Sequence, residues 1–468
     1  MAFNTSLFIL VFVVFYCLYV PLAGKPGLRT ALLFIFNSVF YYLLSSFGLG
    51  ILLALSVADF FLAKGIFTTR SENSKRFFLW ISILLNIGLI LTFRHFSQWF
   101  GFREIPFWPA TIGVSFYVFR SLGYVLDVFH ENIETPETSW FRYFTYLSFF
   151  PLMLQGPISP ARDFLPELRK GFSAKEVPSG EAFFFLISGI IKKYALAAYI
   201  TANFTERVFG SPHLFTGMEN LFAAIGQALV IFLDFSGYTD MMLGMGLLLG
   251  FRLSENFNFP YASANITEYW RRWHMSLSKW LNEYLFFPLS FTLRRWKKWG
   301  TVLAVMITFV ISGFWHGTSL NYTLWGALHG LALSWDIASS GIRDKIKNGV
   351  PMWIYHPISV ALTFLFLALS GIYFKLEDME IATGMLSHIF TDRDWSVFGN
   401  WLHDFGGVFA VMCGVLLWQW SAGNVYPKIR QIFIGSGWFM HAILLVLAIF
   451  LAYQISGMEP IPFIYQKF

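Results

Sequence analysis

The sequence is poor in charged residues. Only 13% of its 468 residues are Asp, Glu, Lys or Arg, about half of the ~25% that is usual in soluble domains. At the same time, 56% of the residues are apolar, more than one water-soluble core could bury. This composition excludes a soluble enzyme, a disordered chain and a fibrous repeat, and it predicts an integral membrane protein.

Cysteine is also nearly absent. Cys17 and Cys413 are the two cysteines, and each lies in a separate apolar segment. Two such residues predict neither a disulfide framework nor a metal cluster, so we expect no bound metal ion.

The sequence instead contains many long apolar segments. Residues 31–58 contain no charged side chain, although about 20 apolar residues are enough for one membrane span. Similar stretches lie near 6–23, 77–93, 107–129, 143–161, 182–206, 218–250, 300–315, 319–340, 353–374, 405–424 and 437–457. None has the period-2 alternation of a membrane barrel. The sequence therefore predicts an all-α, polytopic membrane protein with roughly 11–13 helices, some of them re-entrant or interfacial.

Basic residues gather in short polar segments between the apolar runs. Such clusters mark the cytoplasmic side of a membrane protein, and contact with lipid headgroups is their ordinary role, so the +6 net charge does not require a nucleic-acid partner. The clusters are Lys25/Arg29, Lys64/Arg70/Lys75/Arg76, Arg162/Arg169/Lys170, Lys192/Lys193, Arg294/Arg295/Lys297/Lys298 and Arg343/Lys345/Lys347.

Two histidines occur in a stretch without any charge. Residues 301–335 lack Asp, Glu, Lys and Arg, and basic clusters flank them on both sides, which predicts a helical hairpin. Counted from the flanks, His316 and His329 lie about 25 Å and about 21 Å along the two helices. We expect them at similar depth, with Gly313 and Gly326 permitting close helix packing. Polar side chains inside spans are functional candidates, although each imidazole could instead bind a buried carbonyl.

A third histidine, His274, lies in a polar and aromatic segment at 268–289. Its charged and polar residues recur every three or four positions, which predicts one helix with a polar stripe, lying at the interface or re-entering the bundle. An interfacial anchor of Trp and Arg explains the stripe but not the histidine. A cationic, aromatic helix is also suited to a phosphorylated donor of the coenzyme A type, with Arg271 and Arg272 as candidate contacts. Upstream, Asp234 and Asp240 interrupt an apolar segment, and we favour a structural role for both.

Several blocks together resemble the membrane-bound O-acyltransferase (MBOAT) family, in particular its bacterial branch that acylates alginate, peptidoglycan or teichoic acid. The blocks are FSGYTDMMLG, ENFNFPY, YWRRWHMSLSKWLNEYLFFPL and SGFWHGTSLNYTLWGALHG. The resemblance extends from about residue 111 to the C-terminus. It implies one integral domain over 1–468, with peripheral N-terminal helices at 1–110, a catalytic core at 111–340 and C-terminal helices at 341–468, arranged around a central tunnel.

The resemblance also implies a reaction. An acyl group, most simply acetyl, would pass from a cytoplasmic thioester (acetyl-CoA or an acyl carrier protein) to hydroxyl groups of a surface polysaccharide. His316 would be the general base, and His274 would polarise the acyl carbonyl or orient the acceptor. The other candidate substrate-binding or tunnel-lining residues are His329, Trp315, Trp273, Arg271, Arg272, Asn265, Ser278 and Asp240. No tightly bound cofactor is expected.

The family resemblance also implies a location in the cell and a set of partners. We expect a multi-pass protein of the bacterial cytoplasmic membrane, in contact with membrane lipids, that works with a separate extracytoplasmic acyltransferase or acyl-accepting partner and with no nucleic acid. Three alternatives stay open: D-alanyl transfer to teichoic acid from a carrier protein, a transporter without acyl chemistry, and a scaffold.

Overall fold

The computed structural model describes residues 6–96 and 113–456. Every regular element in these two ranges is helical, which confirms the all-α prediction. Nine helices in the described part of the chain are long and apolar enough to cross a membrane, which confirms a polytopic membrane protein. The part of the expected segment 107–129 that precedes residue 113 lies outside the described residues.

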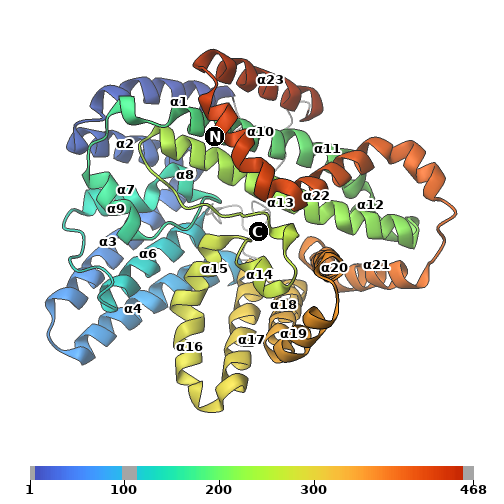
Figure 1. The fold of residues 1–468 in the computed structure, drawn as a ribbon. Coiled ribbons are helices and arrows are strands. Elements are labelled where there is room, and N and C mark those ends of the chain that lie inside the picture. The colour runs from blue at the N-terminus through green and yellow to red at the C-terminus, as the bar shows by residue number, and fades with distance from the viewer. Residues whose placement is uncertain (1–5, 97–112, 457–468) are drawn as a thin grey trace. The chain divides into compact units, whose positions relative to one another are not determined.

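The chain divides into two compact units, Met1–Leu186 with Tyr238–Glu255, and Ile187–Gly237 with Asn256–Phe468. Helices α10 and α13, which are labelled in Figure 1, have residues in both units. The helices that begin in the first unit are α1 (Ser6–Tyr19), α2 (Pro26–Leu44), α3 (Ser46–Thr68), α4 (Glu72–Ile90), α6 (Val114–Phe129), α7 (Trp140–Ser148), α8 (Phe150–Met153), α9 (Ala161–Arg169) and α10 (Ser179–Ile190).

The remaining helices begin in the second unit. They are α11 (Ala198–Ile200), α12 (Glu206–Gly210), α13 (Gly217–Leu248), α14 (Ile266–Trp270), α15 (Met275–Leu281), α16 (Phe287–Thr292), α17 (Lys297–His316), α18 (Leu320–Ala338), α19 (Ser340–Gly349), α20 (Met352–Lys375), α21 (Met379–Thr391), α22 (Phe398–Gly435) and α23 (Trp438–Ser456).

Buried polar side chains join helices within the first unit. Asp59 on α3 accepts hydrogen bonds from Ser82 and Asn86 on α4 and from Ser121 on α6, at 2.6, 2.7 and 2.5 Å. In an apolar surrounding an unpaired carboxylate would be very costly, so this carboxylate fixes the three helices against one another.

The expected span at 143–161 is wrong. The helix α7 ends at Ser148, and the four-residue α8 is followed by an extended segment through Pro160. Gly156 permits the tight turn, because a Cβ there would stand 2.3 Å from the carbonyl oxygen of Pro151. Prolines in this segment remove backbone donors and prevent one continuous helix.

The cluster Lys192/Lys193 also differs from the prediction. The side chain of Lys193 is 1% exposed and pairs with Asp234 on α13 instead of facing lipid headgroups. A buried ammonium needs such a partner, and the pair gives Asp234 the structural role that we expected.

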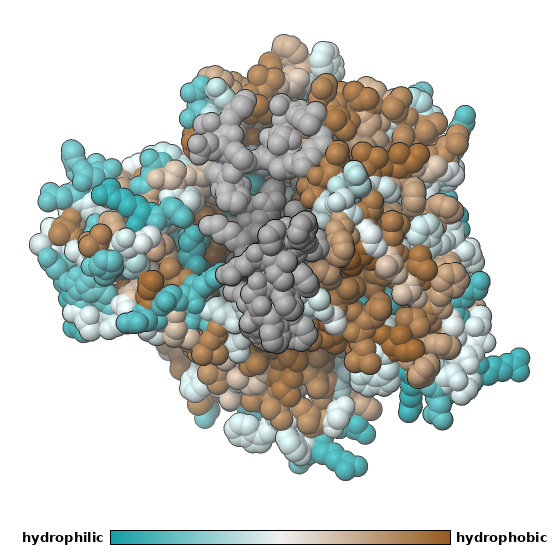
Figure 2. Space-filling view, turned by 180° about the vertical axis from the view of Figure 1, so that it is seen from behind, coloured by the Kyte–Doolittle hydropathy of each residue, from teal (hydrophilic) through white to brown (hydrophobic). Residues whose placement is uncertain are grey.

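The described surface is unusually apolar. Large hydrophobic side chains are exposed on many helices, and Figure 2 shows broad apolar areas on the face that it presents. A water-soluble protein rarely leaves such large patches uncovered. In a membrane, these exposed apolar side chains contact lipid acyl chains instead of water.

Candidate active site

The helices α17 and α18 form the predicted hairpin, and they run side by side in Figure 1. Their contact is close because two glycines face each other: a Cβ on Gly313 would lie 2.3 Å from the Tyr322 carbonyl oxygen, and one on Gly326 would lie 2.3 Å from that of Phe309. Any larger side chain would push the two backbones apart. The glycines therefore set the distance between the helices that carry His316 and His329.

The turn of the hairpin is tied to the end of α20. The Ser319 hydroxyl donates to the Glu377 carbonyl oxygen at 2.6 Å, and the Asn321 amide donates to that of Leu376 at 2.6 Å. Gly317 lies under the ring of Tyr322, where a Cβ would approach the ring to 2.4 Å. These contacts hold the turn and the residue before it, His316, in one place.

His316 is the last residue of α17 and is 3% exposed. Three aromatic rings surround its imidazole: Trp315, Phe374 and Trp325, with centroids at 4.4, 5.0 and 5.3 Å. Phe374 comes from the end of α20 and Trp325 from α18. Trp315, a predicted pocket-lining residue, is the sequence neighbour of His316, whereas the sequence did not indicate Trp325 or Phe374.

His329 is held by hydrogen bonds at both ring nitrogens. The indole Nε1 of Trp270 lies 3.3 Å from Nδ1, and the Ser370 hydroxyl lies 3.4 Å from Nε2. An indole N–H can only donate, so Nδ1 accepts and Nε2 carries the proton that it donates to Ser370. His329 is 1% exposed and uses both nitrogens, and its hydrogen bonds join α14, α18 and α20.

The two histidines of the hairpin do not lie at similar depth. His316 is next to the turn, whereas His329 lies in the middle of α18, beside Gly330, which faces Met306 and Phe309. The seven residues from Phe309 to His316 correspond to about 10 Å along the helix. The expectation was wrong because α18 ends at Ala338 and residues 340–349 form the separate helix α19.

The segment around His274 is not one continuous helix. The helix α14 ends at Trp270, and α15 begins at Met275, with His274 between them in the left-handed conformation (φ 42°, ψ 52°). Hydrogen bonds to a neighbouring strand-like segment cause the break: the amide of Asn258 donates to the Arg272 carbonyl oxygen, and that of Met275 donates to the Asn256 carbonyl oxygen. A left-handed non-glycine residue costs about 1–3 kcal/mol and often marks a functional site.

The surroundings of His274 fix its tautomer. Oδ1 of Asn256 accepts from the amide of Ser276 at 3.2 Å and lies 3.4 Å from Nδ1 of His274. Because this oxygen is an acceptor, Nδ1 carries the proton, and Nε2 is an acceptor. His274 is 2% exposed, and Nε2 is a buried atom without a hydrogen-bond partner among the described residues. Such a nitrogen can accept a hydrogen bond from a bound hydroxyl.

Aromatic side chains connect the histidines within the second unit. Successive ring centroids along the run are between 4.8 and 6.4 Å apart. From His316 to His274 the intervening rings are Trp325, Trp270, Tyr269, Trp273 and Phe235. Trp273, another predicted pocket-lining residue, therefore packs within this run of rings near His274.

The other predicted site residues have varied surroundings. Asn265 caps α14 by accepting from the Glu268 amide at 2.8 Å, and Ser278 donates to the Trp273 carbonyl oxygen at 3.2 Å. Arg272 forms a salt bridge with Glu268 at 2.6 Å. These three residues hold the local backbone around His274.

Arg271 and Asp240 are the remaining two candidates. Arg271 is exposed. Asp240 is buried on α13 but belongs to the first compact unit, unlike the histidines. Within residues 6–96 and 113–456, no group of three or more His, Cys, Asp and Glu side chains is placed to hold a metal ion.

Sequence reasoning missed Asn256. It lies 18 residues before His274 in the sequence, in the block ENFNFPY that carried part of the family resemblance. Two asparagines close to a proline, just after an apolar segment, were the available signal, but they did not indicate which histidine the amide would reach.

Buried histidines on helices that are long enough to cross a membrane are consistent with acyl-transfer chemistry. Comparison with known proteins identifies the class of protein. The sequence model of the membrane-bound O-acyltransferase family matches residues 130–376. These residues include His274, His316 and His329. The chain belongs to the MBOAT family, and it is a multi-pass membrane O-acyltransferase.

The chain is also similar to individual proteins of known class. The chain is 31% identical to the probable alginate O-acetylase AlgI of Pseudomonas syringae pv. tomato, over 85% of this chain and 76% of that protein. It is 29% identical to the peptidoglycan O-acetyltransferase of Helicobacter pylori, over 82% and 79%. A shorter match, 26% identical over 48% of this chain and 58% of the relative, is to the teichoic acid D-alanyltransferase of Bacillus subtilis.

Proposed function

We propose that this O-acyltransferase moves an acetyl group from a cytoplasmic thioester, acetyl-CoA or an acyl carrier protein, to hydroxyl groups of a cell-surface polysaccharide. Two relatives whose names specify O-acetyl transfer align with more than four fifths of the chain, which supports acetyl as the group. The main observation in support of the proposal is the position of His316 at the hairpin turn that is bonded to the end of α20. His316 is buried there among aromatic rings, which exclude water from it.

In the proposed reaction His316 is the general base. Its imidazole removes the proton from the acceptor hydroxyl while the oxygen attacks the thioester carbonyl carbon. The carbon–sulfur bond then breaks, and the leaving thiolate takes the proton from the imidazolium, so that an ester and a thiol are formed. A positioned base of this kind contributes typically 10²–10⁴-fold in rate.

His274 has a different part in the proposed reaction. Because Asn256 keeps the proton on Nδ1, Nε2 can accept a hydrogen bond from a second hydroxyl of the acceptor, next to the one whose proton goes to His316. It cannot donate a hydrogen bond to the acyl carbonyl. Of the two roles that the sequence left open for His274, orientation of the acceptor has this support. Arg271, which is exposed, is the proposed contact for phosphate groups of the donor.

The proposal also includes the enzyme's location and its partner protein. We place it in the bacterial cytoplasmic membrane, with the thioester supplied from the cytoplasm and a separate extracytoplasmic protein receiving the acyl group or passing it to the polymer. The bacterial relatives support this placement.

Two other functions have some support. The match to a teichoic acid D-alanyltransferase favours D-alanyl transfer, for which a carrier protein would be the donor. Buried ionisable residues such as Lys193 and Asp234 also occur in transporters.

Proteoliposomes that contain the purified full chain distinguish these functions. With radiolabelled acetyl-CoA and a soluble oligosaccharide, the proposal predicts thioester cleavage and a labelled ester. Counterflow of acetyl-CoA without cleavage would mean transport. Activity with a D-alanyl carrier protein and indifference to acetyl-CoA would mean D-alanyl transfer.

A further inference from the structure

A pocket of about 470 Å³ lies in the first compact unit, separate in the chain from the buried histidines. It is bounded by the beginning of α2, the beginning of α7 and the end of α9. Two arginines, Arg142 and Arg169, line it together with apolar side chains. Neither the family resemblance nor the proposed reaction uses these residues.

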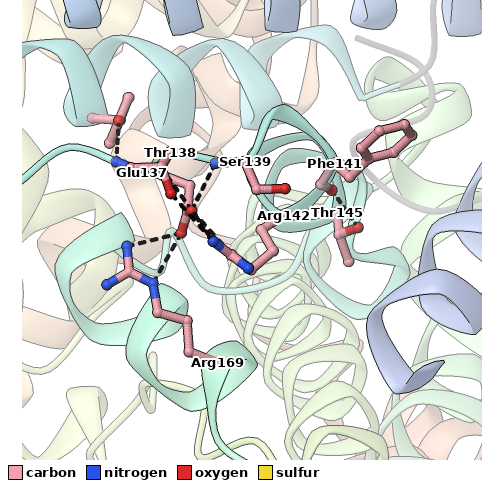
Figure 3. A network of polar contacts seen from close by, with 8 residues as sticks. Glu137, Thr138, Ser139, Phe141, Arg142, Thr145 and Arg169 are labelled. Carbon is pink, nitrogen blue, oxygen red and sulfur yellow. Dashed lines mark hydrogen bonds and ion pairs between the residues drawn. The ribbon is translucent and has the colours of Figure 1, made fainter. Parts of the chain in front are cut away.

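The two arginines are held by one buried carboxylate, as Figure 3 shows. Glu137 is 3% exposed; its Oε1 accepts from Nε and Nη2 of Arg142 at 3.0 and 2.8 Å, and its Oε2 accepts from the same atoms of Arg169 at 3.0 and 2.8 Å. The amides of Thr138 and Ser139 also donate to Oε1. The carboxylate is thus saturated, and both guanidinium groups are fixed in orientation.

This arrangement leaves cationic N–H groups for another anion. One carboxylate balances only one of the two guanidinium charges. The Nη1 atoms of Arg142 and Arg169 take no part in the bonds to Glu137, and the side chains are 34% and 43% exposed. Guanidinium groups that are already oriented lose little entropy when they bind a phosphate oxygen.

The remaining wall of the pocket is apolar and continues along α2. Phe34, Ile35 and Phe141 line the pocket, and Ile35 and Phe141 are 57% and 59% exposed. Val39, four residues after Ile35 and on the same helical face, is 52% exposed. An apolar track therefore leads from the arginines toward the middle of α2.

The position of the pocket on α2 indicates the level in the bilayer. The helix α2 is one of the candidate membrane spans, and the pocket is built from its first turns, Pro26 to Ile35. The first turns of a span lie at the headgroup region, and the following residues lie beside the acyl chains. The cationic part and the apolar track have the same order as the headgroup and the chain of a lipid.

We propose that this pocket binds one anionic glycerophospholipid. Its phosphate oxygens accept hydrogen bonds from Nη1 of Arg142 and of Arg169, and one acyl chain lies along Phe34, Ile35 and Val39. The inference is independent of the proposed acyl transfer. Lipid at this place joins α2, α7 and α9 in addition to their direct contacts.

Native mass spectrometry of the detergent-purified full chain tests the proposal. It measures the affinity of the first bound lipid molecule, with phosphatidylglycerol and phosphatidylcholine as probes. Gly27→Trp fills the pocket without touching Glu137, since a Cβ at Gly27 meets no atom within 4 Å. Gly50→Trp is the matched control, because Gly50 has equally open space on α3. Arg169→Gln removes one phosphate donor, and Arg393→Gln, at an exposed arginine in another segment, is its control.

We expect wild type and both controls to bind phosphatidylglycerol more tightly than phosphatidylcholine. Gly27→Trp and Arg169→Gln should each weaken the first phosphatidylglycerol adduct about tenfold, the equivalent of one charge-assisted contact. Unchanged binding by Gly27→Trp would overturn the proposal, as would equal binding of the two lipids. Competition by inorganic phosphate at the same concentration would also overturn it, by showing a site for free phosphate.

Discussion

At the scale of single residues, the buried imidazoles of His329 and His274 differ in what their ring nitrogens contact. His329 uses both nitrogens, for Trp270 and Ser370, while His274 uses only Nδ1, for Asn256. A histidine whose two nitrogens are both occupied cannot take a proton from a substrate without losing a contact. The hydrogen bonds therefore leave one ring nitrogen of His274 available to a hydroxyl group and none of His329.

Asn256 is the residue that gives His274 its tautomer, so we expect Asn256→Leu to impair acyl transfer. The replacement has similar volume, but it removes the acceptor for Nδ1 and for the Ser276 amide. Loss of such an orienting partner should lower kcat roughly 10–100-fold, with a smaller change in the KM for the thioester. Steady-state kinetics with acetyl-CoA measures both constants.

The control for this variant is Asn203→Leu. Asn203 is exposed and donates only to the Tyr199 carbonyl oxygen, so its loss should leave kcat unchanged. Equal kcat values for Asn256→Leu and wild type would show that the amide does not orient a reacting histidine.

The candidate histidines could be predicted from the sequence because they interrupt charge-free or aromatic segments. Their partners could not: Trp270 reaches His329 across 59 positions, and Asn256 reaches His274 across 18. Such pairs follow from tertiary packing, and neither helical periodicity nor composition contains that information.

At the scale of elements, the hairpin of α17 and α18 depends on the absence of side chains at its contact. We predict that Gly326→Ala lowers the stability of the protein by about 1–3 kcal/mol, as overpacking does, and reduces activity. The added methyl group would meet the Phe309 carbonyl oxygen at 2.3 Å and displace the helix that bears His329. Thermal unfolding in detergent and an acyl-transfer assay on the same sample measure the two effects.

Gly371→Ala on α20 is a matched control for this substitution, because a Cβ there has nothing within 4 Å. It should leave stability and activity close to wild type. If both alanine variants unfolded at the wild-type temperature, close packing at Gly326 would not support the hairpin.

The segment that contains Glu137 should make the protein sensitive to acid. Burial by itself raises the pKa of Glu137, but hydrogen bonds from Arg142, the Ser139 amide and Arg169 outweigh it and hold the pKa below its ordinary value. A carboxyl group with a lowered folded-state pKa stabilises the fold above its unfolded pKa, about 4.3. That stabilisation is lost as the pH falls through the lower, folded-state value.

We therefore expect the wild-type melting temperature to fall steeply below about pH 4.3, and that of Glu137→Gln to fall less over the same range. Melting curves between pH 7 and pH 3 provide the measurement. Glu72→Gln is the control: Glu72 pairs with Lys75 but its own side chain is 64% exposed, and pairs at the surface contribute little to stability. Parallel curves for wild type and Glu137→Gln would contradict this account.

Element boundaries show where sequence periodicity was insufficient. The polar stripe at 268–289 contains real pairs, such as Arg272 with Glu268, yet the helix is broken at His274. Backbone hydrogen bonds from residues 256–258 compete with the helical ones there. Periodicity describes a helix in isolation and cannot include a competing segment.

At the scale of the whole molecule, low charge and long apolar runs were sufficient to predict a polytopic helical membrane protein. Composition could not predict where the few buried charges would go. Lys193 pairs with Asp234, and Asp59 is satisfied by hydroxyl and amide groups from neighbouring helices. In an apolar surrounding each charge requires a partner inside the protein, and such partners are known only once the helices are packed.

The most direct test of the central claim is the initial rate of acetyl transfer from radiolabelled acetyl-CoA by purified His316→Ala, compared with wild type and His403→Ala. His403 has an 89% exposed side chain, so its variant should keep the wild-type rate. His316→Ala should lose activity by 10²–10⁴-fold, the typical contribution of a general base, while it unfolds at a similar temperature. A folded His316→Ala protein that transfers acetyl groups at the wild-type rate would contradict the account.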